Sequence, residues 1–547
     1  MKGNLVRLFK IQSPFNLNLR KESMKIARVS FLFSIIFFLI TINGFPQEPS
    51  HFSRMDLSVK GQILRIVPSD LNGDSLKDLI VAYRTGYSFD TERWLAVFFQ
   101  TKAEVFNFSP DVVWRVPEEG SIIDVANIDE QEGEEIILFT TEGVSCYKEM
   151  SAKEPPLLED LIDIDVDSVT KVAPKEDLSY ADYCKDWLGR GKSELLIPGF
   201  LTSAFIDSHL LNKILSEKKL PKNSDRPINL ERGPHNRLFQ KLEIPSFSHY
   251  VPGMQEALFS SFAFPSVSSL DENGDQLKDI IALRENRLFV FHQGKDHKLP
   301  TSPSKVIELD VLNPREKESG RTRYAVLLDD INEDGVADAY SWKMRAEGFA
   351  NFVGDSKVFF GKRRTGIGEK PDHILTIPHG YYISTNARDY DGDGKKEISI
   401  FSIKFGLWGY VKMFLTHKLK VYINIFKLDQ EGRYPTAPTL TDSYSIKIDL
   451  SRGFDIPAYQ ISDFNGDQIQ DLIFGTEKDE VSIFLGTGMK NNKLFFKDPS
   501  DSIVVDPYAV IIADSLKGDE YNDLIFFYTA GVKSRGKIIL MKNNRIW

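Results

Sequence analysis

The chain has 547 residues, of which 42% are hydrophobic and 27% charged, and its formal net charge is −10. This composition is that of an ordinary globular protein and excludes an intrinsically disordered chain. The acidic excess argues against sequence-independent nucleic-acid binding, in which Lys and Arg neutralise phosphates. Two cysteines exclude both a disulfide framework and a four-cysteine zinc site.

An uncharged apolar segment at residues 29–42 follows Lys25 and Arg28. This order is typical of a secretory signal peptide, and the segment is shorter than the roughly 20 residues of a spanning helix. We therefore expect residues 1–44 to be a signal peptide region, with Met24 as a second candidate start. The mature chain would be exported to the periplasm, the cell surface or the medium, with a net charge of −16 instead of −10. An uncleaved signal anchor is the alternative.

A nine-residue acidic loop recurs five times after the signal region. Each copy has oxygen-bearing side chains at positions 1, 3, 5 and 9, and position 7 offers its backbone carbonyl. Positions 1, 3, 5, 7 and 9 are Asp70, Asn72, Asp74, Leu76 and Asp78; Asp271, Asn273, Asp275, Leu277 and Asp279; Asp330, Asn332, Asp334, Val336 and Asp338; Asp389, Asp391, Asp393, Lys395 and Glu397; and Asp463, Asn465, Asp467, Ile469 and Asp471.

Alternate carboxylates in a short loop suit Ca²⁺, which takes six to eight oxygen ligands in flexible geometry. An EF-hand is excluded, because position 12 holds no Glu and the flanking segments are short apolar runs typical of strands. The alternative is a set of Asn-Gly and Asp-Gly hairpin turns, which favour the same residues. Five copies with a carboxylate at position 9, which a turn does not need, favour about five calcium sites.

Three further copies are degraded. One keeps oxygens at all four positions with fewer charges, and we treat it as a weaker metal candidate: Asn127, Asp129, Gln131 and Glu135. A second, from Asp186 to Glu194, has Arg190 where a ligand should stand, and its guanidinium could replace a cation. The last, around Asp514, has an extra residue and Lys517 in the loop. We assign no metal to these last two.

The acidic loop leading into an apolar strand resembles the FG-GAP/VCBS repeat of integrin-type β-propellers. The segments VFFGKRRTG at residues 358–366 and IFLGTG at residues 483–488 resemble the Phe-Gly and Gly-x-Gly parts of that repeat. The resemblance covers nearly all of residues 50–547 in eight units. It implies an all-β propeller with calcium in its loops, and it specifies no ligand.

The ninth positions of the eight loops are 52 to 85 residues apart, which fits four-stranded blades. One unit predicts strands at 324–328, 339–343, 357–360 and 374–377. The last unit lacks its fourth strand, and residues 52–59 have no blade of their own. We therefore predict a propeller of eight blades over residues 50–547, closed by the N-terminal strand. Seven blades remain if the unit around Asp186 is not a blade.

Two segments, 199–250 and 404–418, are insertions between the second and third strands of their blades. Residues 200–219 have apolar side chains at helical spacing, which predicts an amphipathic helix. Residues 405–415 are unusually apolar for a loop, and exposed apolar patches indicate interaction. We expect Trp408, Tyr410 and Phe414 to contact a partner or a membrane surface. Packing against the propeller is the alternative for both segments.

The chain contains no H-E-x-x-H, G-x-S-x-G, P-loop or Rossmann motif. Cys146 and Cys184 fall in neighbouring predicted blades, and their pairing stays open. We expect a monomeric, non-enzymatic calcium-binding protein that binds an extracellular protein or glycan and no nucleic acid. The alternative is a glycan-active enzyme, because some calcium-containing eight-bladed propellers that resemble this family are polysaccharide lyases.

Overall fold

The computed structural model describes residues 51–547 with short gaps. The gaps are 87–89, 130, 149–153, 164–175, 200–201, 208–210, 212–227, 230–239, 245–246, 251–259, 320, 348–351, 378–379, 405–406, 448–458, 478, 507–508 and 532–533. The predicted signal peptide lies outside the described residues. Within them, no helix is long and apolar enough to cross a membrane.

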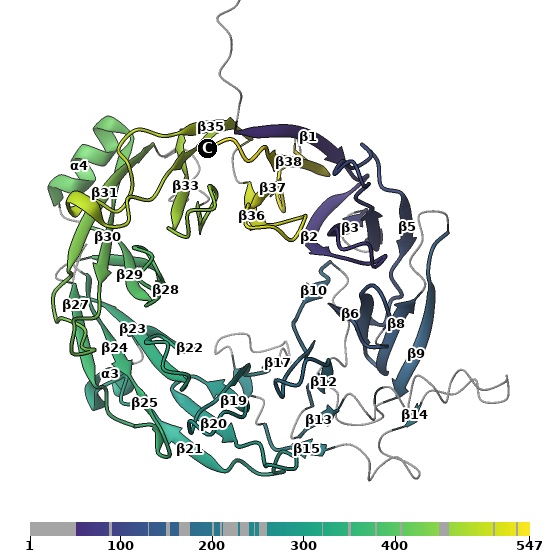
Figure 1. Ribbon diagram of the computed structural model, residues 1–547, viewed down its shortest axis with the longest axis horizontal. Helices are drawn as coiled ribbons and strands as arrows, with labels where there is room; N and C mark the ends of the chain where they lie inside the picture. Colours follow the sequence, from purple (N-terminus) through teal and green to yellow (C-terminus); the bar gives the residue numbers. More distant parts are fainter. Residues whose placement is uncertain are drawn as a thin grey trace, which may run out of the picture. The chain divides into compact units, whose positions relative to one another are not determined.

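The described residues from Phe52 onward form an eight-bladed β-propeller, which confirms the predicted fold class (Figure 1). The first four blades contain β2 (Gln62–Ser69), β3 (Asp78–Thr85), β4 (Glu92–Phe98) and β5 (Val112–Arg115); β6 (Gly120–Ala126), β7 (Glu135–Thr140), β8 (Gly143–Lys148) and β9 (Leu157–Asp163); β11 (Cys184–Lys185), β12 (Glu194–Ile197), β13 (Ser203–Ile206) and β15 (Gln240–Leu242); and β18 (Ser266–Leu270), β19 (Asp279–Arg284), β20 (Arg287–Phe291) and β21 (Lys305–Glu308).

The last four blades contain β22 (Arg323–Asp329), β23 (Asp338–Ala346), β24 (Phe352–Phe359) and β27 (His373–Ile377); β28 (Tyr381–Arg388), β29 (Glu397–Ile403), β30 (Lys418–Phe426) and β31 (Leu440–Lys447); β32 (Tyr459–Ser462), β33 (Asp471–Glu477), β34 (Glu480–Phe484) and β35 (Asp501–Val504); and β36 (Val510–Asp514), β37 (Asp523–Phe527), β38 (Lys537–Asn543) and β1 (Phe52–Ser58). The fifth of these eight blades has its strands where the sequence predicts them. The unit around Asp186 forms a blade, so the propeller has eight blades rather than seven.

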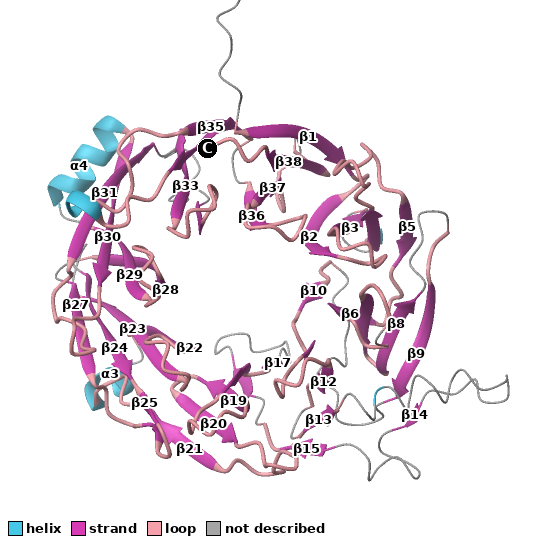
Figure 2. Ribbon diagram, viewed as in Figure 1, coloured by secondary structure: helices cyan, strands magenta, loops and turns pink. Residues whose placement is uncertain are grey.

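Shorter elements decorate this ring. β10 (Ser179–Tyr180) and β14 (Ile228–Asn229) extend the second sheet by parallel pairing with β6 and β9. β16 (Phe247–Tyr250) pairs with β17 (Ser260–Ala263), and β25 (Gly361–Lys362) with β26 (Gly366–Ile367). The described helices are α3 (Pro314–Ser319), α4 (Leu407–Thr416) and the single turn η4 (Lys490–Asn492). Figure 2 shows α3 and α4 on the outer side of the ring.

The second strand of each blade is an apolar run because both of its faces pack against neighbouring blades. All seven residues of β29 are buried, as are the first six of β3. The sequence therefore shows continuous hydrophobic strands rather than an alternation, as in any sheet covered on both faces. Cys146 and Cys184 are buried thiols in the core between the second and third blades.

The N-terminal strand closes the ring, as the sequence predicts. β1 pairs antiparallel with β38, from Phe52 opposite Asn543 to Ser58 opposite Lys537. It is the fourth strand of the eighth blade and lies on the outer side of the ring (Figure 1). Two chain segments almost 500 residues apart in sequence thus complete one sheet.

The two predicted insertions differ from expectation. The first lies between β13 and β15, the third and fourth strands of its blade, rather than between the second and third. Ser203–Ile206 forms β13, which pairs with β12, so the prediction of a helix over residues 200–219 is wrong there. Strand pairing within the third blade overrides the helical spacing of a short apolar run. Residues 212–219 lie outside the described residues. Residues 407–416 join β29 to β30 as expected, but as the helix α4 rather than a loop.

Candidate cation-binding loops and an aromatic cavity

The acidic loops all join the first strand of a blade to its second, and they share one backbone conformation. In the first blade, the Asp70 carboxylate accepts the backbone N–H groups of Gly73 (2.8 Å), Asp74 (3.2 Å) and Ser75 (2.8 Å). The Asp74 carboxylate accepts the Leu76 N–H at 3.0 Å. The loops of the fourth, fifth, sixth and seventh blades repeat the bonds to position 1 and position 5.

Positions 4 and 6 hold the left-handed backbone conformation in these loops. In the sixth blade both are glycines, Gly392 (φ 76°) and Gly394 (φ 84°). In the first blade they are Gly73 (φ 75°) and Ser75 (φ 67°). Glycine adopts this conformation without steric cost, which explains the recurrent Gly in the sequence motif. The two left-handed residues curl the loop so that its carboxylates face inward.

The carboxylate at position 9 has a structural role of its own. Asp78 is fully buried, and its two oxygens accept the N–H groups of Leu71 (3.1 Å) and Gln100 (2.9 Å). Asp523 of the degraded eighth loop makes the same pair of bonds, to Leu516 (3.2 Å) and Asn543 (2.7 Å). The inference that a turn needs no carboxylate at position 9 is therefore wrong. Evidence for a metal rests on positions 1, 3 and 5.

Four loops carry carboxylates without a basic partner. In the described part of the chain, no ion pair involves the carboxylates at positions 1, 5 and 9 of the loops in the first, fourth, fifth and seventh blades. These are Asp70, Asp74, Asp78, Asp271, Asp275, Asp279, Asp330, Asp334, Asp338, Asp463, Asp467 and Asp471. Burial, followed by the charges of Asp74 and Asp70, raises the pKa of Asp78 to about 7. An all-oxygen donor set of this charge fits a hard divalent cation.

The other loops carry basic side chains instead. In the third blade, Arg190 binds Glu194 at 2.6 Å, so its guanidinium occupies the loop as the sequence suggests. In the eighth, Arg545 binds Asp519 at 2.6 Å. The Leu516–Asp523 bond places Ser515 at position 1, so this loop has nine residues and the predicted extra residue is wrong. It also leaves Asp514, the last residue of β36, outside the loop, where it binds Lys77.

The weaker candidate in the second blade keeps part of the scaffold. Glu135 accepts the Ile128 N–H at 2.9 Å, as position 9 does elsewhere. The Gln131 side-chain amide donates to Asp129 at 3.1 Å, so two of the proposed ligands are bonded to each other. Asn127 donates to the backbone carbonyl of Gln131. This loop therefore folds with its own hydrogen bonds and only two acidic ligand positions.

The sixth-blade loop brings its acids closest together. Ligand atoms of Asp389, Asp391 and Glu397 all lie within 4.8 Å of one another. The Lys427 ammonium binds Asp391, lies 2.8 Å from Asp393 Oδ2, and is 3.7 Å from Glu397 Oε1. Burial alone would lower the pKa of Lys427, but its bonds to Asp391 and Asp393 outweigh burial and raise it. Lys427 is therefore charged and sits among the loop's carboxylates.

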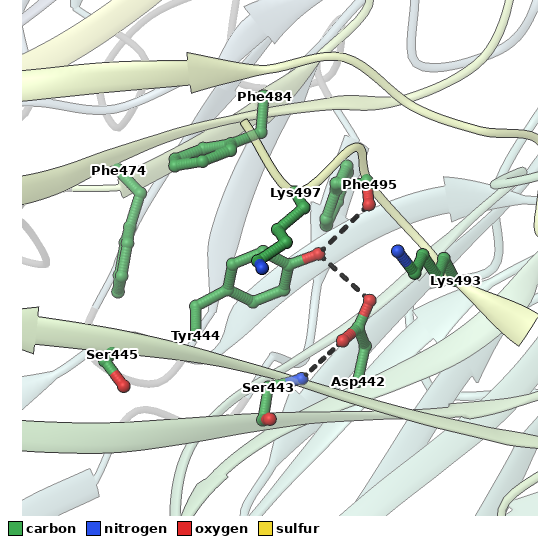
Figure 3. A pocket seen from close by; sticks show the side chains of 9 residues that line it. All are labelled: Asp442, Ser443, Tyr444, Ser445, Phe474, Phe484, Lys493, Phe495 and Lys497. Atoms are coloured by element: carbon green, nitrogen blue, oxygen red, sulfur yellow. Dashed lines mark hydrogen bonds between the residues drawn. The ribbon is translucent and has the colours of Figure 1, made fainter. Parts of the chain in front are cut away.

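A cavity of about 380 Å³ lies between the sixth and seventh blades (Figure 3). Its apolar wall is formed by Tyr444 and by three buried rings, Phe474, Phe484 and Phe495. The Tyr444 hydroxyl donates to Asp442 Oδ2 at 3.0 Å. The remaining lining residues are polar: Asp442, Ser443, Ser445, Lys493 and Lys497. Figure 3 shows both lysines extending toward the Asp442–Tyr444 pair. No sequence motif marks this site, because its residues come from three strands and a connection.

The predicted partner-contact segment is partly described. Phe414 of α4 is 57% exposed and Leu415 is 77% exposed, whereas Met413 is buried in the core between the sixth and seventh blades. α4 leaves the sheet at the end opposite the acidic loops, because successive antiparallel connections alternate between ends. The side chains of Trp408 and Tyr410 lie outside the described residues.

No protein-family model matches the chain, and no curated protein matches it at a significant level. Solved structures do match. A lectin of Agrocybe aegerita that recognises non-reducing terminal N-acetylglucosamine is 13% identical, with a TM-score of 0.34 over 89% of this chain and 86% of the lectin. The V. cholerae biofilm matrix protein Bap1 is 11% identical, with a TM-score of 0.27 over 90% and 87%. The exotype rhamnogalacturonan lyase YesX is 11% identical, with a TM-score of 0.32 over 90% and 76%.

Proposed function

We propose that this protein is an exported, monomeric carbohydrate-binding propeller of FG-GAP/VCBS type, with structural Ca²⁺ in the acidic loops of four blades. The cavity between the sixth and seventh blades carries the proposal for the ligand. A saccharide has apolar C–H faces and a rim of hydroxyls, which match a site of aromatic side chains with a few fixed polar groups. Lys493 and Lys497 favour a sugar that carries carboxylate or sulfate groups.

The cavity supports binding rather than lyase chemistry. A lyase needs a base that removes a proton from the substrate. In the cavity we consider Tyr444 for this role, because its hydroxyl is hydrogen-bonded to the Asp442 carboxylate. Burial, together with the Asp442 charge, raises the pKa of Tyr444 well above its ordinary value. The phenol therefore stays protonated at neutral pH and serves as a hydrogen-bond donor. The enzyme alternative predicts unsaturated products from uronate polymers, and we expect none.

A glycan screen of the mature chain (residues 45–547) tests the ligand. We expect binding to acidic polysaccharides that weakens with added salt, because ammonium–anion attraction is screened. Exchanging both cavity lysines for Gln, as Lys493→Gln with Lys497→Gln, should abolish most of it. Lys490→Gln is the matched control, since Lys490 is exposed in the same connection but does not line the cavity. Equal binding by both variants would refute the assignment.

The calcium proposal rests on the four loops without a basic partner. Calcium would neutralise the carboxylates at positions 1 and 5 of each loop and would fix one face of the ring. Elemental analysis of protein dialysed against calcium measures this directly. An absence of bound calcium, together with a melting curve that is the same in excess chelator, would contradict it.

Protein binding through α4 is a second candidate, favoured by the exposure of Phe414 and Leu415. Such a surface would lie at the end of the sixth blade opposite the acidic loops. The two candidates use different residues, so variants separate them.

A further inference from the structure

Of the eight loops, the sixth alone has carboxylates at all four of positions 1, 3, 5 and 9. It is also the loop whose acids surround a lysine. Lys427 follows the last residue of β30, and its ammonium reaches Asp391, Asp393 and Glu397 at positions 3, 5 and 9. Three of the four acidic positions therefore share one positive charge.

The equivalent residue differs in the blades proposed to hold calcium. The residue after the third strand is Phe99 in the first blade, Phe360 in the fifth and Leu485 in the seventh. In the fourth blade it is His292, which binds Glu272 rather than a ligand position. None of these four side chains pairs with the acids at loop positions 1, 5 or 9. Among the five complete loops only the sixth has a lysine here, whereas the strand register places Lys148 of the second blade and Lys542 of the eighth at the same position beside two degraded loops.

In two other loops, an arginine rather than a lysine pairs with an acidic side chain of the loop. Arg190 pairs with position 9 of the third loop, and Arg545 pairs with position 5 of the eighth. Their basic groups come from different places in the sequence, one from within the loop and one from the C-terminus. Each places a fixed cation on a loop carboxylate; the third loop has left-handed residues at positions 4 and 6, and the eighth has one at position 4.

We propose that Lys427 is the built-in cation of the sixth loop and takes the place of calcium there. An ammonium and a divalent cation repel each other and compete for the same oxygens, so the loop holds one or the other. The role of Lys427 in the sixth loop does not depend on calcium in the other loops. The proposed calcium sites of those loops enter only when the ions bound to the unaltered protein are counted. With Lys427 in the sixth loop, that count falls from the five that the sequence predicts to four.

The proposal implies that a calcium site is latent in the sixth loop. Asp391 Oδ1 is buried and accepts no hydrogen bond from the described residues, so an oxygen remains for a metal. Asp389 keeps its bonds to Gly392 (2.7 Å) and Gly394 (2.8 Å), which hold the loop curled. Removing the ammonium should leave four carboxylates in a preformed loop.

The test is Lys427→Met, which keeps the length of the side chain and removes its charge. Lys418→Met is the matched control, because Lys418 is exposed at the other end of β30. Bound calcium is counted by elemental analysis after dialysis, and melting is followed with and without chelator. We expect four ions in the unaltered protein and in the control, and five in Lys427→Met. In chelator, Lys427→Met should melt at a lower temperature than the control, and calcium should restore it.

A double variant, Lys427→Met with Asp393→Ala, covers the case in which the single variant fails to fold without calcium, because it removes the position-5 carboxylate that all four proposed calcium loops carry. Removing one carboxylate relieves the repulsion, so it should fold in chelator and gain no fifth ion. The proposal is overturned if Lys427→Met binds no more calcium than Lys418→Met, or if the unaltered protein holds five ions. Zero ions in the unaltered protein and one in Lys427→Met would refute the calcium assignment of the other loops while supporting this one.

Discussion

The loops of the first and third blades share a backbone and differ in charge. In both, position 1 accepts the N–H of position 6, through Asp70 in one and Asp186 in the other, at 2.8 and 2.9 Å. In both, a buried carboxylate at position 9 accepts an N–H from the start of the loop. Within the described residues, no carboxylate of the first loop has a basic partner, whereas Arg190 pairs with Glu194 at position 9 of the third. Conformation therefore depends on positions 1, 4, 6 and 9, whereas positions 3 and 5 determine whether a cation is needed.

The largest expected effect comes from opening the ring on which all eight loops are mounted. A chain starting at Gly61 lacks β1, which buries Phe52 and Leu57 and covers the edge of β38. An unpaired strand edge promotes aggregation. We expect little soluble protein from this chain and normal yield from one that starts at about Glu48. Similar yield and melting temperature for the two would show that β1 does not hold the ring closed.

The next largest effect on stability is expected from substitution at position 9 of an acidic loop, compared with substitution at position 5. Asp78→Ala leaves the N–H groups of Leu71 and Gln100 buried without an acceptor, which costs about 2–6 kcal/mol of unfolding free energy. Asp74→Ala should cost much less in chelator but should lose one calcium ion. Denaturant unfolding of both variants in chelator makes the comparison. Equal losses would mean that position 9 has no special structural role.

Much of this fold was predictable because the sequence patterns that specify its strands and loops are local and repeated. Strand order, blade number and the closing role of residues 52–59 follow from spacing and from one missing strand. The loop chemistry was only partly predictable. Position 9 carries a buried structural bond that sequence spacing could not distinguish from a metal ligand. Lys427 lies 30 residues from Glu397, and its approach to the loop depends on where the β30 strand ends.

Removing calcium should have a smaller, graded effect on the loops that lack basic partners. These loops lack the bidentate Glu of an EF-hand, so we expect dissociation constants of about 0.1–1 mM. At free calcium roughly tenfold above that constant, each site stabilises the folded state by about 1.4 kcal/mol. Melting should therefore shift with the logarithm of calcium concentration. A third-blade variant such as Asp186→Asn should leave the slope of that dependence unchanged, and a reduced slope would assign a metal to the loop with Arg190.

The fourth blade should show a pH dependence of still smaller size. The His292 ring lies 2.9 Å from the buried Glu272, and this bond raises the pKa of His292, although burial opposes the shift. The stabilisation is complete below the unfolded pKa of about 6.5 and is lost as pH rises through the higher folded value. His292→Gln should therefore lower stability by about 1 kcal/mol at low pH and by less at high pH. The stability difference between His292→Gln and the unaltered protein should change with pH and should disappear when both carry Glu272→Gln. A difference that stays constant with pH, or that persists in the Glu272→Gln background, would contradict this pairing.

The smallest effect on stability is expected for Phe414 of α4, at the end of the ring opposite the acidic loops, and its neighbour Met413 provides the buried contrast. Met413 is 2% exposed, so Met413→Ser should cost about 2–5 kcal/mol through a cavity in the core between the sixth and seventh blades. Phe414 is 57% exposed, so Phe414→Ser should change stability by no more than about 0.5 kcal/mol.

If α4 binds a partner or a membrane surface, Phe414→Ser should nonetheless reduce binding to anionic vesicles or to a captured extracellular protein. Its calcium count and melting temperature should match those of the unaltered chain. Unchanged binding in Phe414→Ser, and in the triple exchange of Trp408, Tyr410 and Phe414 to Ser, would exclude α4 as a contact surface. The cavity between the sixth and seventh blades would then be the remaining candidate for recognition, and loss of glycan binding in the cavity-lysine variant would establish it independently of α4.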